Sequence, residues 1–263
     1  MKLENKSHHL RIATTMVRKF INPLSDSLIE IPRLLPTVCV VCGRSVVTAI
    51  ALCEPCKKAL PWINSACSKC GENNALSLQL GELCSGCYLS PPPFHHCRGL
   101  FHYRAPIDTL ISGFKYHARF DIGHAFSYLL AIKIQEHYDS GEKPDVLLPV
   151  PLHPHRLRTR GYNQALEIAK VVESICKIPV NSSLAYRKKD TKPQTETRSA
   201  SSRRKNLASA FEINHATSSE SVRSIAIIDD VVTTMATISS LSNTLSEAGM
   251  KVVDVWCIAR ASG

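Results

Sequence analysis

Ile225-Ala-Ile-Ile-Asp-Asp-Val-Val-Thr-Thr-Met-Ala-Thr-Ile238 is the stretch that decides the fold of this chain. Its first four residues are apolar, and such a run before a polar turn predicts a buried parallel strand. Beyond the turn, apolar residues recur at helical spacing as far as Ala248, and Gly249 follows where a C-terminal helix cap is expected. A strand, a loop and a helix N-terminus in this order predict an anion site, because free backbone N–H groups and the helix dipole meet there.

Two aspartates and three threonines add specific chemistry to this anion site. Asp229 and Asp230 can accept hydrogen bonds from sugar hydroxyls or hold a hydrated Mg²⁺ ion. Hydroxyl donors follow at Thr233, Thr234 and Thr237. A phosphorylated sugar would use both halves of the site. The simpler alternative is an ordinary strand and helix joined by a polar turn, which the paired acids disfavour.

The segment resembles the ribose-phosphate-binding motif of type I phosphoribosyltransferases, in which two acids precede a Thr-Thr-Gly-x-Thr loop. The resemblance implies that Asp229 and Asp230 hold the ribose hydroxyls of phosphoribosyl pyrophosphate, directly or through Mg²⁺, and act as catalytic residues. It also implies that the 5′-phosphate is bound by Val231, Val232, Thr233, Thr234, Met235, Ala236 and Thr237.

Met235 departs from the motif, because it stands where the family has glycine. Glycine tolerates a positive φ angle and a close approach of the backbone to a ligand, whereas a residue with a Cβ atom tolerates them less well. Two alternatives follow: either the loop keeps a conformation open to methionine, or phosphate binding is weakened.

The N-terminal third of the chain contains four Cys-x-x-Cys pairs. They are Cys39 and Cys42, Cys53 and Cys56, Cys67 and Cys70, and Cys84 and Cys87. Two such pairs complete a tetrahedral zinc site, so eight thiolates predict two structural zinc ions. Disulfides are the alternative, but the charged N-terminus does not resemble a secretory signal, and cytoplasmic thiols stay reduced. The spacing does not distinguish consecutive from crossed pairing.

A zinc-binding N-terminal module joined to a phosphoribosyltransferase-like domain resembles the ComF family (competence protein ComF, GntX-like). Two further stretches carry the resemblance: Pro149 to Gln164, and Thr191-Lys-Pro-Gln194 through Phe211. The family implies a role in DNA uptake and competence, or in the use of external DNA. It also implies a pyrophosphate site at Leu152 to Tyr162 and a flexible lid at Arg187 to Arg204. The residues assigned to catalysis and to the leaving group in this way are Lys115, Arg156, Arg158 and Arg160.

Strands alternate with helices along the rest of the chain, which predicts a parallel α/β sheet wrapped by right-handed crossovers. Such a sheet is also the type I phosphoribosyltransferase arrangement. The expected organisation is a partly disordered lead-in segment (1–36), a cysteine-rich double zinc-finger-like module (37–98) and a phosphoribosyltransferase-like domain (99–263). The expected elements are a strand or hairpin and a short helix at His102–Tyr116, a helix at Phe126–His137, a strand at Val146–Val150, a helix at Tyr162–Cys176, and strands at Ser183–Tyr186 and Val252–Ala259.

The formal net charge of +10 is unevenly distributed. Between Arg187 and Lys205, eight basic and two acidic residues give a local charge of +6, since 8 − 2 = 6. This basic segment could neutralise a pyrophosphate or contact a nucleic-acid backbone. No apolar run reaches the roughly 20 residues that a membrane-spanning helix needs. We therefore expect a cytoplasmic protein without membrane insertion.

Three functions of different kinds remain open at this point. The first is a phosphoribosyltransferase that uses an acceptor the sequence does not identify. The second is a non-catalytic module that binds single-stranded DNA or a helicase-like competence protein, with an affinity that falls steeply with salt. Aromatic residues make up only 6% of the chain, so base stacking would contribute little to it. The third is a regulator that senses phosphoribosyl pyrophosphate without turning it over.

Overall fold

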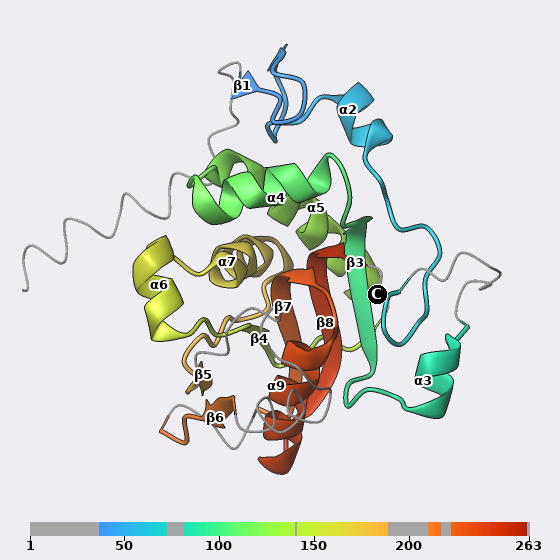
Figure 1. The fold of residues 1–263 in the computed structure, drawn as a ribbon, viewed down its shortest axis with the longest axis vertical. Helices are drawn as coiled ribbons and strands as arrows, with labels where there is room; N and C mark the ends of the chain where they lie inside the picture. Colours follow the sequence, from blue (N-terminus) through green and yellow to red (C-terminus); the bar gives the residue numbers. More distant parts are fainter. Residues whose placement is uncertain (1–36, 73–81, 140, 189–209, 217–221, 262–263) are drawn as a thin grey trace, which may run out of the picture.

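The computed structural model describes residues 37–72, 82–139, 141–188, 210–216 and 222–261 (Figure 1). The lead-in segment 1–36 and residues 189–204 of the expected lid lie outside these ranges. The same holds for the stretch Thr191 to Gln194.

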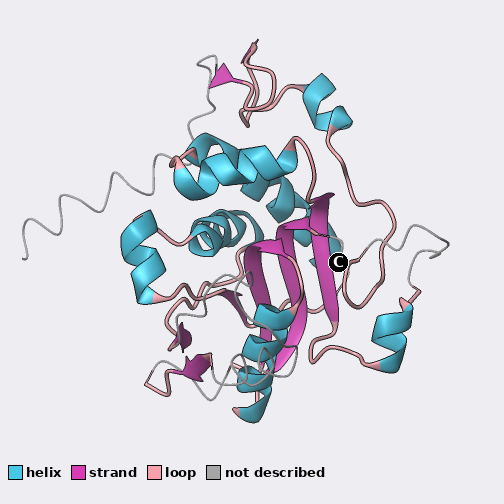
Figure 2. Ribbon diagram, in the orientation of Figure 1, coloured by secondary structure: helices cyan, strands magenta, loops and turns pink. Residues whose placement is uncertain are grey.

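A four-stranded parallel sheet forms the centre of the molecule, in the strand order β3-β8-β7-β4 (Figure 2). This confirms the predicted parallel α/β architecture. The strand β7 is buried on both faces over its apolar run, as a central parallel strand should be. The strands span His96–His102 (β3), Val146–Pro149 (β4), Ser224–Val232 (β7) and Lys251–Arg260 (β8).

Helices cover both faces of this sheet. Successive side chains of a strand point to opposite faces. Accordingly, Ala226 and Ile228 join the core formed with α4, α5 and α7, whereas Ile225 and Ile227 join the core formed with α9. A small antiparallel pair of strands, β5 with β6, contributes Ala185 to the second core. These elements span Ile107–Tyr116 (α4), Phe120–Tyr138 (α5), Gln164–Cys176 (α7), Ala185–Arg187 (β5), Phe211–Ile213 (β6) and Ala236–Glu247 (α9).

Most of the expected elements are found, with boundaries moved by one to six residues. The largest difference concerns the first strand of the sheet, which ends at His102 instead of beginning there. Consequently β3 crosses the boundary expected between residues 98 and 99, and α4 follows it after a short turn. The strand β7 also continues through Asp229 and Asp230, because β8 pairs with it as far as Val232.

The cysteine-rich module contains a short hairpin and a short helix near its start and a second short helix near its end. They are β1 (Thr37–Val38), β2 (Ser45–Val46), α2 (Glu54–Ala59) and α3 (Ser85–Leu89). The buried side chains of Val40, Ile50 and Leu52 join the same apolar core as α4 and α5. Figure 1 shows this part of the module above α4, from where the chain runs along β3 toward α3.

Trp62 lies in the linker that runs along β3. Its ring centroid is 4.6 Å from that of Phe101, and its indole N–H donates to the Lys57 carbonyl over 2.8 Å. Main-chain hydrogen bonds from Ile63 to Leu100 and from His102 to Pro61 also join the linker to β3. The linker therefore covers part of the otherwise open edge of the sheet. None of the helices in the described ranges combines the length and apolar character that crossing a bilayer requires.

Candidate functional site

A small hollow lies between the end of β7 and the start of α9. Its volume is about 60 Å³, and it is lined by Asp229 and by residues 231–238. We call residues 231–237 the phosphate loop, after the ribose-phosphate-binding motif that this segment resembles. The N-terminal N–H groups of a helix have no partner within that helix and favour an anion. The 12-residue helix α9 begins at Ala236, so its first turn borders the hollow. The hydroxyl-bearing residues Thr233 and Thr234 are exposed beside it.

Met235 occupies the left-handed backbone region, with φ 62° and ψ −10°, as the N-cap residue of α9. The loop thus has the conformation that glycine favours, with methionine in its place. A residue with a Cβ atom in this conformation costs roughly 1–2 kcal/mol. The half-buried Met235 side chain packs against apolar neighbours of the α9 core, and this packing offsets part of that cost.

The structure brings Lys115 from α4 to the two acids at the end of β7. Its Nζ lies 3.1 Å from Oδ2 of Asp230, and its side chain is only 19% exposed. The other carboxylate oxygen of Asp230 accepts a hydrogen bond from the N–H of Val231 over 2.7 Å. Asp229 accepts from the N–H of Asp230 over 2.9 Å. Asp230 is therefore held by a cation and by the main chain, whereas Asp229 has no ammonium at this distance among the ion pairs of the described residues.

Charge is not balanced evenly across these three side chains. Burial and the adjacent Asp230 carboxylate raise the pKa of Asp229 to about 8. Burial lowers the pKa of Lys115, but the Asp230 charge outweighs it, so that the net pKa of Lys115 is raised. When both acids are ionised, the pair carries one negative charge more than Lys115 neutralises, and this excess favours the proton that Asp229 retains below about pH 8. A divalent cation, or several sugar hydroxyl donors, would relieve this excess.

The segment expected to be a pyrophosphate-binding loop forms the helix α6 (Pro154–Arg160) instead. Proline at the first turn and Gly161 at φ 81° after the last one delimit the helix. Arg160 donates to Gln164 over 3.1 Å and to the Tyr116 hydroxyl over 3.3 Å, which ties the end of α6 to the end of α4. Arg156 is half-buried and Arg158 is exposed on the same helix.

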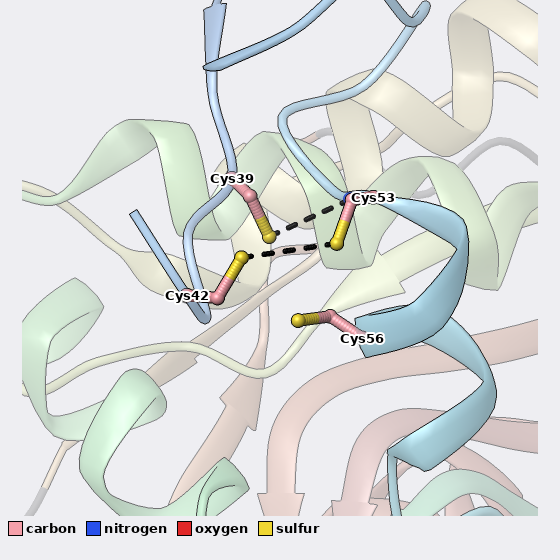
Figure 3. A group of neighbouring side chains, drawn as sticks. All are labelled: Cys39, Cys42, Cys53 and Cys56. Carbon is pink, nitrogen blue, oxygen red and sulfur yellow. Dashed lines mark hydrogen bonds between the residues drawn. The ribbon is translucent and has the colours of Figure 1, made fainter. Parts of the chain in front are cut away.

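The eight paired cysteines form two separate groups of four. Within each group, the four sulfur atoms lie within 4.8 Å of one another. The pairing is therefore consecutive. We call the two groups cluster 1, formed by Cys39, Cys42, Cys53 and Cys56, and cluster 2, formed by Cys67, Cys70, Cys84 and Cys87. Figure 3 shows the side chains of cluster 1 pointing toward one another from the loop after β1 and from the start of α2.

The same backbone turn builds both clusters. In cluster 1, the N–H of Gly43 donates to the Cys39 carbonyl over 2.9 Å, and in cluster 2 the N–H of Gly71 donates to the Cys67 carbonyl over 2.9 Å. Both glycines have positive φ angles, 73° and 66°, which glycine adopts without steric cost. We call this turn, from the first cysteine of the pair to the glycine, the knuckle of each cluster. Four sulfur donors in a closed arrangement suit a structural zinc ion.

One cysteine in each cluster has a lowered pKa, whereas the pKa values of Cys56 and Cys70 are raised by hydrogen bonds to neighbouring thiols and by burial, respectively. Burial raises the pKa of Cys39, but hydrogen bonds from backbone N–H groups outweigh it and lower the pKa to about 6. The same two influences lower the pKa of Cys67 to about 7. Since zinc binds the thiolate form, the backbone of each knuckle prepares its first ligand for metal.

Sequence reasoning missed Arg260, the last residue of β8. Its guanidinium donates to the carbonyl of Val232 over 3.2 Å and to that of Thr233 over 2.5 Å, although the residue is only 4% exposed. Two carbonyls of the phosphate loop are therefore fixed by a buried cation. The available signal was a charged residue that closes a nearly continuous apolar strand.

Together, the parallel sheet and the paired cysteine clusters define a class: an α/β domain with a parallel central sheet that carries a double zinc ribbon. A family model described as the double zinc ribbon domain matches residues 31–88.

Several relatives match most of the chain. It is 30% identical over 227 residues to competence protein F of Haemophilus influenzae, covering 85% of this chain and 96% of that one. It is 29% identical over 230 residues to the DNA utilization protein YhgH of Escherichia coli O157:H7, covering 86% and 98%. It is 24% identical over 243 residues to competence protein ComFC of Streptococcus pneumoniae, covering 84% and 99%. The chain belongs to the competence protein F family.

Among solved structures, adenine phosphoribosyltransferase from Leishmania tarentolae aligns with 49% of this chain and 55% of its own, at 15% identity and a TM-score of 0.33. A similarity of this size carries no inference about activity.

Proposed function

We propose that the protein binds phosphoribosyl pyrophosphate together with Mg²⁺ at the phosphate loop, and that it serves DNA uptake or the use of external DNA. The observation that carries the proposal is the paired acids Asp229 and Asp230 beside a hollow of about 60 Å³ at a helix N-terminus. The resemblance of this segment to the ribose-phosphate-binding motif supports the ligand. The names of the competence and DNA utilization relatives support the process.

Each part of the site has a role in this proposal. The phosphate loop holds the 5′-phosphate through backbone N–H groups and threonine hydroxyls. Asp229 and Asp230 hold the ribose hydroxyls or the hydrated Mg²⁺, and Lys115 positions Asp230. The charge of the pyrophosphate is neutralised by arginines of α6, namely Arg156, Arg158 and Arg160.

Phosphoribosyl transfer would depend mainly on positioning and on charge. The ribose carbon gains oxocarbenium character as the pyrophosphate leaves, so a fixed ribose and a neutralised leaving group lower the barrier. Arginine suits the second task because its planar fork can grip two phosphate oxygens. A completed transfer requires an acceptor beside the ribose carbon, whereas a sensor would bind the ligand without one.

The test is calorimetric titration of phosphoribosyl pyrophosphate in the presence of Mg²⁺. We expect micromolar binding by the wild type and by Asp121→Asn, a control that removes an exposed ion pair with Arg119. The double variant Asp229→Asn/Asp230→Asn should lose binding by at least about 100-fold, since it removes both carboxylates that contact the ribose or the cation. Equal affinity in the double variant and the control would overturn the assignment.

Met235→Gly separates two ways in which the wild type could fail to bind. Binding by the glycine variant alone would show that methionine has closed the site. If neither the wild type nor Met235→Gly binds phosphoribosyl pyrophosphate, the non-catalytic alternative is favoured. In that alternative, basic residues hold single-stranded DNA or a helicase-like competence protein. Such binding should fall steeply between about 50 and 200 mM salt. The cysteine clusters support a reducing compartment, and the proposal therefore places the protein in the cytoplasm.

A further inference from the structure

Arg260 connects the phosphate loop to a residue far away in the sequence. Besides the Val232 and Thr233 carbonyls, its guanidinium contacts the carbonyl of Cys70, a member of cluster 2, through Nε over 3.0 Å. Its Nη2 lies 3.8 Å from a carboxylate oxygen of Glu72, which follows the same knuckle. One buried side chain thus joins the end of β8, the phosphate loop and the knuckle of cluster 2.

Met235 makes a second, independent contact between the loop and cluster 2. Its side chain packs against the buried group formed by the four cysteines of this cluster. Met235 also has the positive φ angle described above, which costs free energy unless its surroundings hold it. The cluster therefore contacts the one residue of the phosphate loop whose backbone most needs support.

The turn at Gly71 in cluster 2 lies in close contact with the sheet. A Cβ atom built on Gly71 would lie 2.6 Å from the carbonyl oxygen of Cys97 in β3, well inside van der Waals contact. The strand β3 in turn pairs with β8, which ends in Arg260. The knuckle is consequently fixed between β3 on one side and Arg260 on the other.

We propose that cluster 2, with zinc bound, is a positioning element of the ligand site, and that Arg260 and Met235 transmit its position to the phosphate loop. The proposal rests on the proposed function in that the ligand of the loop is the 5′-phosphate of phosphoribosyl pyrophosphate. Arginine is required because a buried planar guanidinium can donate to three carbonyls at once, whereas a lysine ammonium has a different geometry. By linkage, a ligand that stabilises the loop must also make zinc in cluster 2 harder to remove.

The experiment measures zinc loss separately at each cluster. The full-length, zinc-loaded protein is mixed with excess chelator and N-ethylmaleimide, and the alkylation of each cysteine is followed by mass spectrometry. Wild type is compared with Arg260→Lys and with Arg98→Lys. The control Arg98 also lies in the sheet, where it pairs with Asp254 over 3.0 Å and contacts neither the loop nor cluster 2 through a hydrogen bond among the described residues.

We expect cluster 2 of Arg260→Lys to be alkylated about tenfold faster than in the wild type, the ratio that the loss of roughly one charge-assisted hydrogen bond produces. Cluster 1 should react at the wild-type rate in all three proteins. Met235→Ala, which trims the second contact and leaves Arg260 intact, should accelerate cluster 2 in the same direction. It provides the same test if Arg260→Lys does not fold. Unchanged rates at cluster 2 in the folded variants would overturn the proposal.

Repeating the alkylation experiment with ligand present tests whether cluster 2 positions the phosphate loop or only contributes to the stability of the fold. Phosphoribosyl pyrophosphate with Mg²⁺ should slow alkylation of cluster 2 in the wild type and in Arg98→Lys, and should slow it much less in Arg260→Lys. Calorimetry on the same samples shows whether the ligand binds. Binding that protects both clusters equally, or neither, would refute the link while leaving the proposed function intact. Absence of binding with selective acceleration in Arg260→Lys would refute the proposed function and support the link.

Discussion

Cluster 1 and cluster 2 repeat one cysteine motif in two different surroundings. In cluster 1, Cys42 is exposed and both cysteines from the second pair are half-buried, and the neighbouring apolar residues pack on α4 and α5. In cluster 2, all four cysteines are buried, and their neighbours are Met235 and Arg260. The first cluster covers an apolar core, whereas the second supports a polar loop. Identical ligand sets can therefore have different roles, which are decided by what each knuckle contacts.

Removing one thiolate from each cluster in turn tests this difference between the clusters with the largest expected effect. We expect Cys70→Ser to lower the melting temperature by roughly 10 °C and Cys42→Ser by about half as much, since the buried cluster has no water to replace the lost ligand. Thermal unfolding and zinc analysis measure both effects. The affinity for phosphoribosyl pyrophosphate should fall by at least about tenfold in Cys70→Ser and less than about threefold in Cys42→Ser. Equal losses of affinity would show that the two clusters serve the loop alike.

A change of pH should affect the loop while leaving both clusters loaded with zinc. The pKa of Asp229 is raised to about 8, and Mg²⁺ or ribose hydroxyls prefer the ionised carboxylate. Ligand affinity should therefore rise by about eightfold between pH 7 and pH 8.5, as this proton is lost. Calorimetry at the two pH values measures the change, and metal analysis at each pH confirms the zinc content. In Asp229→Asn the pH dependence should disappear, and its persistence would assign the titration to another group.

The raised pKa of Asp229 makes the stability of the ligand-free protein fall with pH, whereas it makes ligand affinity rise. The folded-state pKa of Asp229 lies above the unfolded value of about 3.9. Its contribution to stability is therefore complete below pH 4 and is lost as the pH rises through about 8. The ligand-free wild type should thus melt at a lower temperature at pH 8.5 than at pH 6. Asp229→Asn should show a smaller difference.

Substitutions of Met235 should change stability least, but they test directly how much the contact between cluster 2 and the phosphate loop contributes. Met235→Gly relieves the positive φ angle but loses the contact with cluster 2, whereas Met235→Ala loses the contact and keeps the strain. The glycine variant should therefore be more stable than the alanine variant by about 1 kcal/mol, the reverse of the usual order in helices and strands. Urea unfolding of the two variants measures this difference. A more stable alanine variant would mean that the backbone at Met235 relaxes.

Sequence patterns were sufficient for the central features of the fold. The apolar run of β7 and the amphipathic α9 are local signals, so the strand–loop–helix unit could be predicted from one segment. The sequence also contains the signals that delimit α6, namely Pro154 at its first turn and Gly161 after its last. The family resemblance directed attention to a pyrophosphate site in this segment, and the helix was not predicted. The strand β7 continues through two aspartates because its neighbour β8 pairs with them, which is a non-local cause.

The candidate site was predictable only in part. Asp229, Asp230 and Lys115 were named from motifs, and the structure brings them together, although their roles in binding and catalysis remain predictions. The pairing of the cysteines could not be predicted, since each Cys-x-x-Cys pair is locally equivalent. Arg260 could not be identified from the sequence, because its partners Cys70 and Val232 lie 190 and 28 positions away and no periodic pattern connects them.

The position of Trp62 gives the molecule an optical reporter. The chain has only two tryptophans, Trp62 in the linker between the clusters and Trp256 in the sheet. The indole of Trp62 is half-buried against Phe101, so release of the linker would expose it to water and shift its emission to the red. Trp256 is only 2% exposed and would keep its blue emission until the sheet itself opens. Fluorescence spectra recorded during unfolding would therefore show whether the metal-binding part detaches first or the whole chain melts in a single step.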